Sequence, residues 1–377
     1  MKRGLLALCM LLTAAQAAPE AKPQWSVAAL GELRTAVDAA PAEALPRLDT
    51  ADLDAAWQSS DAARVDREAT RLALRLAKLE LLGSATGRSG WKIVDTDAKI
   101  DLAAELSAAL AENRLGAFLA GLNPQHPDYL ALRSAYAGET DAGKRQTLAR
   151  NMERWRWMPH DLGGDYLLVN AAAYEVRLWR GGKQVGAWRV IVGKPSTPTP
   201  VFNAVVTGVN VNPWWNVPSN IVRESVGSLI RRNPGLARAR GYVWSGGQVR
   251  QKPGANNALG YMKLVMPNPY SVYLHDTPNR DLFERDPRAF SHGCVRVGDA
   301  LDFATALFGG TRSRTDIDAL VAKGDSVVVD LPRQLPVYVT YFTAGLRGDG
   351  SFAYFPDIYG RDRKMAAAVN SGQACPV

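Results

Sequence analysis

The tetrapeptide Ser291-His292-Gly293-Cys294 contains the residue types of a cysteine nucleophile and its supporting loop. A thiol attacks carbonyl carbon as the thiolate, which requires a nearby base or a lowered pKa. The base is either His292, two residues from the cysteine, or His275, at the end of a strand-like segment. We favour His275, because a residue two positions away on an extended chain cannot readily aim its ring at the sulfur, whereas the end of a neighbouring strand can.

Three further positions complete the predicted site. Gly293 allows close backbone approach, and we expect its amide and that of Cys294 to face an oxyanion. His292 then orders the loop or contributes to the oxyanion site. The imidazole of His275 is oriented either by a backbone carbonyl or by Asp276, and the sequence does not choose between them. The alternative is that Cys294 and the histidines are inert, buried residues.

A metal site is a weaker interpretation of the same residues. The chain has only four histidines and shows neither an HExxH motif nor paired CxxC spacing. Three cysteines are too few for a disulfide framework. A single disulfide between Cys294 and Cys375 is the alternative to a free thiolate, and the role of Cys375 stays open.

The sequence pattern changes from helical to strand-like near Tyr166, where apolar and polar residues begin to alternate. The strands that follow are expected to position the site. Strands are predicted at 166–170, 174–178, 187–192, 205–211, 262–265, 271–275, 326–331 and 337–343. Few, late helices (221–232, 300–308 and 316–322) favour a mostly β catalytic domain over 158–345 rather than alternating βαβ units. The segment at about 218–260 is longer than a connection needs, which predicts a substrate-covering loop or, alternatively, an elaboration of the sheet edge.

Residues 28–157 carry a helical pattern. Between 64 and 82, apolar residues recur at spacings of three to four, and 99–122 and 128–156 repeat this behaviour. The sequence therefore predicts an α+β protein: a helical scaffold region, a mostly β catalytic domain with a helical insertion, and a C-terminal tail, 346–377, packed on that domain.

The N-terminal sequence predicts the cellular compartment of the protein, and its composition restricts the classes of partner that it can bind. Lys2 and Arg3, an apolar run over 5–12 and small residues up to Ala17 predict a cleaved secretory signal at 1–17. No later stretch approaches about 18 apolar residues, so we expect a soluble exported protein. The net charge is +8, yet no Lys/Arg-dense run appears, which disfavours nucleic-acid binding.

His275, a 15-residue gap and then Ser291-His292-Gly293-Cys294-Val295-Arg296 resemble the signature of the L,D-transpeptidase (YkuD-type) catalytic domain. Further segments are similar to the YcbB-like periplasmic subgroup: 152–154, 192–195, 199–202, 212–218, 256–260 and 358–362. The chain departs from the family in two ways. Arg296 stands where many members carry Asn, and the chain has no room for the separate peptidoglycan-binding module of the longer members.

The resemblance implies a periplasmic enzyme that acts on peptidoglycan through a cysteine acyl-enzyme, without cofactor or metal. Cys294 would attack the carbonyl of the L-centre of diaminopimelate at stem position three and expel the terminal D-Ala of the donor stem. The side-chain amine of an acceptor stem would then form a 3–3 cross-link, and carbapenems would be inhibitors. The alternatives are an L,D-carboxypeptidase or other cysteine peptidase that uses water as acceptor, and a non-catalytic wall-binding protein.

Several residues are candidates for substrate binding in this interpretation. The aromatic and amide side chains of Trp214, Trp215 and Asn216 are suited to lining a donor cleft, although core packing explains the two rings equally well. Tyr261 has the same two interpretations. Arg296 can orient a carboxylate through its planar guanidinium, or pair with a buried acid. Ser291 completes the set.

Overall fold

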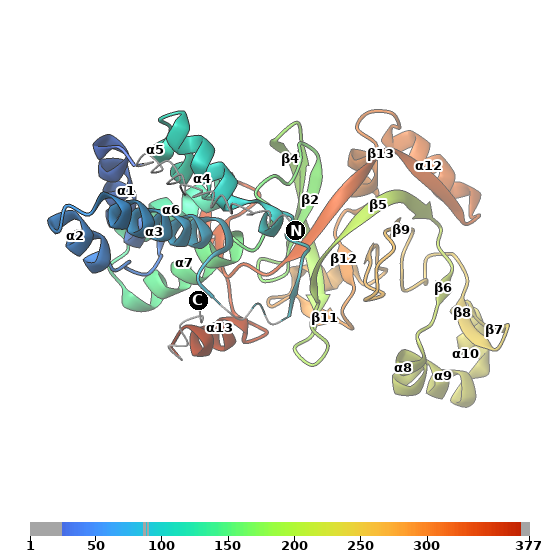
Figure 1. The fold of residues 1–377 in the computed structure, drawn as a ribbon. Helices are drawn as coiled ribbons and strands as arrows, with labels where there is room; N and C mark the ends of the chain where they lie inside the picture. Colours follow the sequence, from blue (N-terminus) through green and yellow to red (C-terminus); the bar gives the residue numbers. More distant parts are fainter. Residues whose placement is uncertain (1–24, 86–87, 89, 371–377) are drawn as a thin grey trace, which may run out of the picture.

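A computed structural model describes residues 25–85, 88 and 90–370. The predicted signal at 1–17 and Cys375 lie outside these residues. The chain forms a helical N-terminal region and then a strand-rich region, which confirms the predicted α+β fold (Figure 1). In the described part of the chain, every helix is too short or too polar to cross a membrane.

The helical region contains seven α-helices. They are α1 (Val27–Ala39), α2 (Ala51–Gln58), α3 (Ala62–Leu82), α4 (Leu102–Ala111), α5 (Leu115–Gly121), α6 (Pro127–Gly138) and α7 (Ala142–Trp155). Ser26, Asp61 and Asp101 begin α1, α3 and α4, and their side chains accept hydrogen bonds from first-turn amides that lack a partner within the helix. The apolar periodicity predicted for 64–82 forms the buried face of α3.

The helices divide between two hydrophobic cores. Leucines and alanines of α1 to α5 form one cluster of their own. Tyr129 and Leu132 of α6 and Leu148 and Trp155 of α7 belong instead to the large cluster around the sheet. Helices α6 and α7, although inside the predicted helical range 28–157, therefore pack as part of the strand-rich region.

The main sheet has ten strands, ordered β1-β5-β13-β2-β3-β4-β12-β10-β9, with β11 paired to β4. Because β9 also pairs with β5, the path from β5 to β9 closes on itself. The strands are β1 (Trp91–Lys92), β2 (Tyr166–Asn170), β3 (Glu175–Arg180), β4 (Lys183–Gly193), β5 (Val201–Val211), β9 (Met262–Val265), β10 (Leu274–His275), β11 (Ala289–Ser291), β12 (Val295–Val297) and β13 (Val327–Thr340). Helices α11 (Ala300–Leu307) and α12 (Arg314–Lys323) precede β13.

The strands predicted at 187–192 and 205–211 each begin four residues earlier, as β4 and β5, and two other predictions differ more from the structure. The segments 326–331 and 337–343 are one strand, β13, whose register shifts between Asp330 and Leu335. The strand predicted at 271–275 is shorter in the structure, where β10 covers Leu274–His275, and Ser271 adopts φ +53°, which is incompatible with an extended chain at that residue.

The insertion at 218–260 is a small folded lobe rather than a loop (Figure 1). Strands β6 (Trp215–Asn216), β8 (Gln248–Gln251) and β7 (Tyr242–Ser245) form a separate sheet beside α8 (Ser219–Ile221), a π-helical turn (Val222–Val226), α9 (Gly227–Arg232) and α10 (Pro234–Ala239). Its hydrophobic core is small, with Val217, Val226 and Val249 as the buried residues of the cluster.

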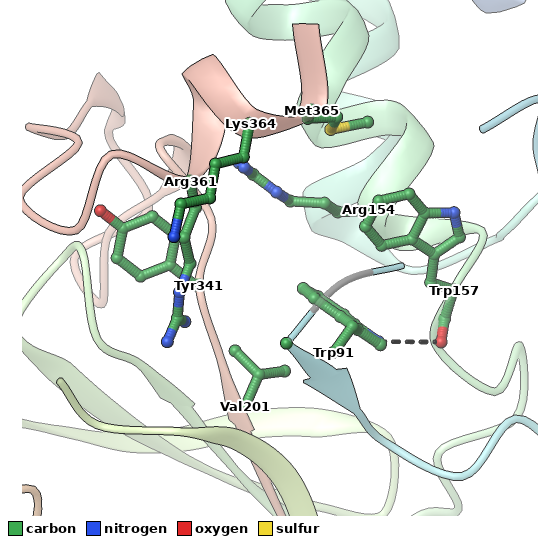
Figure 2. A pocket seen from close by; sticks show the side chains of 9 residues that line it. Trp91, Arg154, Trp157, Val201, Tyr341, Arg361, Lys364 and Met365 are labelled. Carbon is green, nitrogen blue, oxygen red and sulfur yellow. Dashed lines mark hydrogen bonds between the residues drawn. The ribbon is translucent and has the colours of Figure 1, made fainter. Parts of the chain in front are cut away.

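The C-terminal segment packs against α7. It contains β14 (Ala344–Leu346), β15 (Phe352–Tyr354) and α13 (Arg361–Asn370). Asp362 Oδ1 lies 2.6 Å from Arg154 Nη2 of α7, and both side chains are buried. A cavity of about 50 Å³ lies at this junction, with Arg154 and Arg361 on its wall (Figure 2).

Candidate active site

The register of β9, β10 and β12 brings the predicted chemical groups onto one face of the sheet. His275 pairs with Lys263 of β9 on one side and with Arg296 of β12 on the other. Leu274 pairs with Val295, so Cys294 lies level with Tyr273. Because side chains alternate along a strand, Cys294 shares a face with Arg296, and therefore with His275.

The imidazole of His275 is oriented by a main-chain carbonyl. His275 Nδ1 lies 2.5 Å from the carbonyl oxygen of Asp276. A carbonyl only accepts, so this contact assigns the proton to Nδ1 and leaves Nε2 as the basic nitrogen. The Asp276 carboxylate lies elsewhere: it accepts from the Tyr261 amide at 2.8 Å and pairs with Arg280 at 2.9 Å. The role of orienter thus falls to the backbone of Asp276 and not to its side chain.

Burial holds both reacting groups in their neutral forms. Burial, reinforced by the nearby Arg296, lowers the pKa of His275 to about 3. Burial raises the pKa of the Cys294 thiol, while a hydrogen bond from the Tyr273 backbone and the charges of Lys263 and Arg296 oppose that rise. Both groups are therefore neutral at rest, and the Cys294 thiol lies 3.8 Å from the carbonyl oxygen of Ser271.

Polar groups of the loop that carries Cys294 form hydrogen bonds with one another. Gly293 adopts φ +118°, a conformation that favours glycine. Its amide donates to Ser291 Oγ at 3.0 Å, and Ser291 Oγ donates to the Cys294 carbonyl at 2.5 Å. The expectation that both amides face an oxyanion therefore needs correction: the Gly293 amide is occupied, whereas the Cys294 amide has no acceptor within the described residues. Ser291 is buried and serves this turn.

His292 points away from the thiol, toward the insertion. Its Nε2 lies 2.8 Å from Glu224 Oε2 in the π-helical turn. The side chains of His292 and Glu224 are 31% and 50% exposed. This contact joins the active-site loop to the lobe that the sequence predicts as a substrate cover.

The four predicted cleft residues after β5 and before β9 lie at the base of the insertion. Trp214 is half-buried beneath the guanidinium of Arg250, 4.5 Å from the ring centroid, and Asn216 Oδ1 accepts from Arg250 Nε at 2.9 Å. Trp215 packs against the small core of the lobe. Tyr261 is half-buried, and its amide holds the Asp276 carboxylate. In the described part of the chain, none of the four forms a hydrogen bond with Cys294.

Lys263 and Tyr273 are site residues that sequence reasoning missed. Lys263 Nζ lies 3.7 Å from the centroid of the Tyr273 ring, on the face that carries Cys294. Burial lowers the pKa of Lys263 and that of Arg296, and the charge of Cys294 opposes both changes. Strand 262–265 was predicted, but only the register places its lysine beside the thiol.

Among residues 25–85, 88 and 90–370, no cluster of three or more His, Cys, Asp or Glu side chains is arranged to hold an ion. Cys294 carries a free thiol. The arrangement can therefore carry out acyl transfer: a thiol, a base whose tautomer is fixed, and one backbone amide available to an oxyanion.

Comparison with known proteins gives two family matches. Residues 164–329 match the model for the L,D-transpeptidase catalytic domain (YkuD), and residues 11–135 match the Scaffold domain. A Haemophilus influenzae protein named "Putative L,D-transpeptidase" is 33% identical over 247 residues, which cover 59% of this chain and 49% of that protein. The chain thus spans about half the length of this relative.

Similar solved structures include two L,D-transpeptidases. The Enterococcus faecium enzyme is 16% identical over 48% of this chain and 51% of that chain, with a TM-score of 0.26. The Mycobacterium smegmatis enzyme is 12% identical over 47% of this chain and 58% of that chain, with a TM-score of 0.27. On the family matches, this chain contains a YkuD-type L,D-transpeptidase catalytic domain preceded by a Scaffold domain.

Proposed function

We propose that the protein is a periplasmic peptidoglycan L,D-transpeptidase that forms 3–3 cross-links through an acyl-enzyme on Cys294. One observation carries this proposal: a free thiol and an imidazole of fixed tautomer share one face of adjacent strands within the matched catalytic domain. The predicted export signal at residues 1–17 supports the compartment.

Acylation begins with transfer of the thiol proton to His275 Nε2 as the sulfur attacks the carbonyl of the L-centre of diaminopimelate. The carbonyl oxygen becomes an oxyanion, which accepts a hydrogen bond from the Cys294 amide. When the intermediate collapses, the bond to the terminal D-Ala breaks, and His275 returns the proton to the departing amine. The product is a thioester between Cys294 and the donor stem.

Deacylation uses the same groups in reverse roles. The side-chain amine of the acceptor diaminopimelate attacks the thioester and transfers a proton to His275. The C–S bond then breaks, the sulfur recovers the proton, and the new amide is the cross-link. If water replaces the amine, the same chemistry yields a carboxypeptidase, so the acceptor decides between the two activities.

Lys263 and Arg296 support binding of an anionic donor group. Both lie on the face of Cys294, and neither forms an ion pair with a carboxylate in the described part of the chain. The terminal D-Ala of a tetrapeptide stem places a carboxylate one residue beyond the bond that breaks. The guanidinium of Arg296 and the ammonium of Lys263 are suited to bind it, and carbapenems, which also carry a carboxylate beside the reactive carbonyl, would acylate the same thiol.

Incubation of the purified protein with disaccharide-tetrapeptide tests the proposal. Mass analysis of the products should show free D-Ala and cross-linked dimers containing a 3–3 bond, and Cys294→Ala should give neither. If the products are tripeptide monomers without dimers, the enzyme catalyses hydrolysis rather than transpeptidation. Intact substrate after long incubation, together with no adduct after carbapenem exposure, would contradict an enzymatic function.

A further inference from the structure

A turn formed by residues 193–199 lies directly against the loop that carries the nucleophile. The Ser291 carbonyl accepts from the Lys194 amide at 2.9 Å and from Thr197 Oγ1 at 3.2 Å. Thr199 Oγ1 donates to the Gly293 carbonyl at 2.9 Å. The turn therefore holds the loop on both sides of His292, although none of its residues is next to the cysteine in sequence.

Thr199 itself is fixed from several directions. It is fully buried, and its hydroxyl oxygen accepts from the Gly193 amide at 2.9 Å. A Cβ at Gly193 would lie 2.2 Å from the Thr197 carbonyl oxygen, so this tight turn accepts only glycine at its start. The Thr199 hydroxyl donates toward the Gly293 carbonyl, and the Thr199 side chain also interacts with the Tyr359 hydroxyl.

The C-terminal segment completes the support of Thr199. Tyr359 Oη donates to the Gly193 carbonyl at 2.7 Å and accepts from the Thr199 amide at 3.3 Å. Arg361 Nη2 donates to the Thr199 carbonyl at 2.9 Å. Tyr359 stacks on Tyr341, with 5.2 Å between ring centroids, and Figure 2 shows Tyr341 beside Arg361 at the start of α13.

The support of Thr199 affects the active site through the peptide bond between Gly293 and Cys294. The Gly293 carbonyl and the Cys294 amide belong to one planar, trans peptide unit, in which C=O and N–H point in opposite directions. Fixing the carbonyl toward Thr199 therefore aims the Cys294 amide away from Thr199. Gly293 is the residue with the widest conformational freedom, so an unheld peptide here would be free to rotate.

We propose that Thr199, held by Tyr359 and Arg361, is a positioning residue that aims the Cys294 amide at the oxyanion. This inference rests on the proposed acyl transfer, because an oxyanion develops only in that reaction. It also assigns a role to segments 192–202 and 358–362, which lie far from Cys294 in sequence and carry none of the reacting groups.

Two reagents separate positioning of the amide from reactivity of the thiol. Acylation by imipenem passes through a tetrahedral oxyanion at the β-lactam carbonyl. Alkylation by iodoacetamide displaces iodide from a saturated carbon, and no oxyanion forms. Both reactions consume Cys294. Digestion at successive times and mass analysis of the peptide that contains Cys294 gives both rate constants, separately from any alkylation of Cys375.

Tyr359→Phe and Thr199→Val remove the two hydroxyls while keeping the ring and the branched side chain. We expect each to slow acylation by about tenfold, because a misaimed donor should cost less than the roughly 10²- to 10³-fold loss seen when one oxyanion donor is removed. Alkylation should stay within about twofold of wild type. Thr199→Ser, which keeps the hydroxyl, should restore acylation. Tyr354→Phe is the matched control, because its hydroxyl contacts Glu139 at 3.1 Å on the surface of the same segment.

Unchanged acylation in both variants would overturn the inference, and so would an equal loss of acylation and alkylation. If Thr199→Val does not fold, Tyr359→Phe decides, because its ring can still stack on Tyr341. Wild-type protein that is alkylated but never acylated would contradict the proposed function itself. Wild-type acylation that the variants match would contradict only the positioning role.

Discussion

The sheet-built wall and the insertion differ in how firmly the fold holds them. The wall, which consists of His275, Cys294 and their paired strands, continues into the large hydrophobic core, and His275 is 5% exposed. The insertion at 218–260 has a core of three buried valines, and its polar contact with the active-site loop is the exposed pair Glu224–His292. His275 and Cys294 are thus held by the sheet, whereas the insertion is joined to the active-site loop through an exposed ion pair.

This difference has an energetic basis. An exposed ion pair contributes about 0–1 kcal/mol, so thermal motion can break the contact between Glu224 and His292. The buried hydrogen bond of His275 to a backbone carbonyl has no competing water and keeps the ring in place. We therefore expect the chemical step to depend on the sheet and substrate access to depend on the insertion. The two histidines, one on each side, make this division testable.

The largest expected effect is the difference in acylation rate between the His275→Ala and His292→Ala variants. His275→Ala should reduce the rate of acylation by about 10²- to 10⁴-fold, because the proton of the thiol loses its acceptor. His292→Ala should change it by less than about tenfold, because His292 contacts the insertion and not the sulfur. Stopped-flow acylation by imipenem measures both. Near-normal rates in His275→Ala with an inactive His292→Ala would reverse the assignment of the base.

The second effect concerns the cation beside the thiol. Because the charge of Lys263 opposes the rise in the Cys294 pKa, Lys263→Met should move the pH profile of iodoacetamide alkylation to higher pH. At neutral pH we expect about tenfold slower alkylation, equivalent to about 1.4 kcal/mol. Lys183→Met, which alters an exposed lysine on β4, is the control. A profile that stays in place would remove Lys263 from the site.

The third effect is the pH dependence of the free energy of unfolding that results from burying neutral histidines. Burial lowers the folded-state pKa of His275 to about 3 and that of His126 to about 4, below the ordinary value. Between these values and about pH 6.5 the unfolded chain binds more protons, so stability falls as pH decreases through this window. We expect each histidine to contribute on the order of 1–2 kcal/mol to the difference in free energy of unfolding between pH 7 and pH 5.

Urea unfolding at several pH values measures this dependence. His275→Gln should flatten the slope below pH 6.5, and His126→Gln should do so independently, because the two residues lie on different elements. The same slope in both variants and in wild type would show that neither histidine is buried in the neutral form.

The smallest effect concerns the cover. Glu224→Gln should leave acylation by imipenem within about threefold of wild type, since the exposed pair contributes little to the free energy. The KM for disaccharide-tetrapeptide should change more than kcat if the lobe binds or covers the stem. Steady-state kinetics with both substrates checks this. A large fall in kcat for both would show that the insertion belongs to the rigid part of the site.

The sequence predicts those structural elements that depend on patterns within a short stretch of residues. The 3.6-residue period of α3, the alternation from Tyr166 onward and the tetrapeptide Ser291-His292-Gly293-Cys294 are all patterns over a few residues. These features were sufficient for the α+β fold and for a nucleophile with a candidate base on a neighbouring strand.

The remaining features depend on contacts between distant segments. The sequence left the orienter of His275 open, and only the path of the chain after β10 selects the Asp276 carbonyl. Lys263 carries no motif signal, and its place follows from pairing with His275 across two strands. The Gly293 amide was expected to be free, but Ser291 Oγ takes it. Side-chain competition for a backbone group of this kind is invisible in composition or periodicity.

Trapping the intermediate tests the central claim most directly. Wild-type protein mixed with disaccharide-tetrapeptide and quenched in acid within a single turnover should gain the mass of the substrate minus alanine. Proteolysis should place that mass on the peptide containing Cys294, as a thioester that hydroxylamine removes. Turnover without any such adduct, or the same adduct on Cys294→Ala, would contradict covalent catalysis by this thiol.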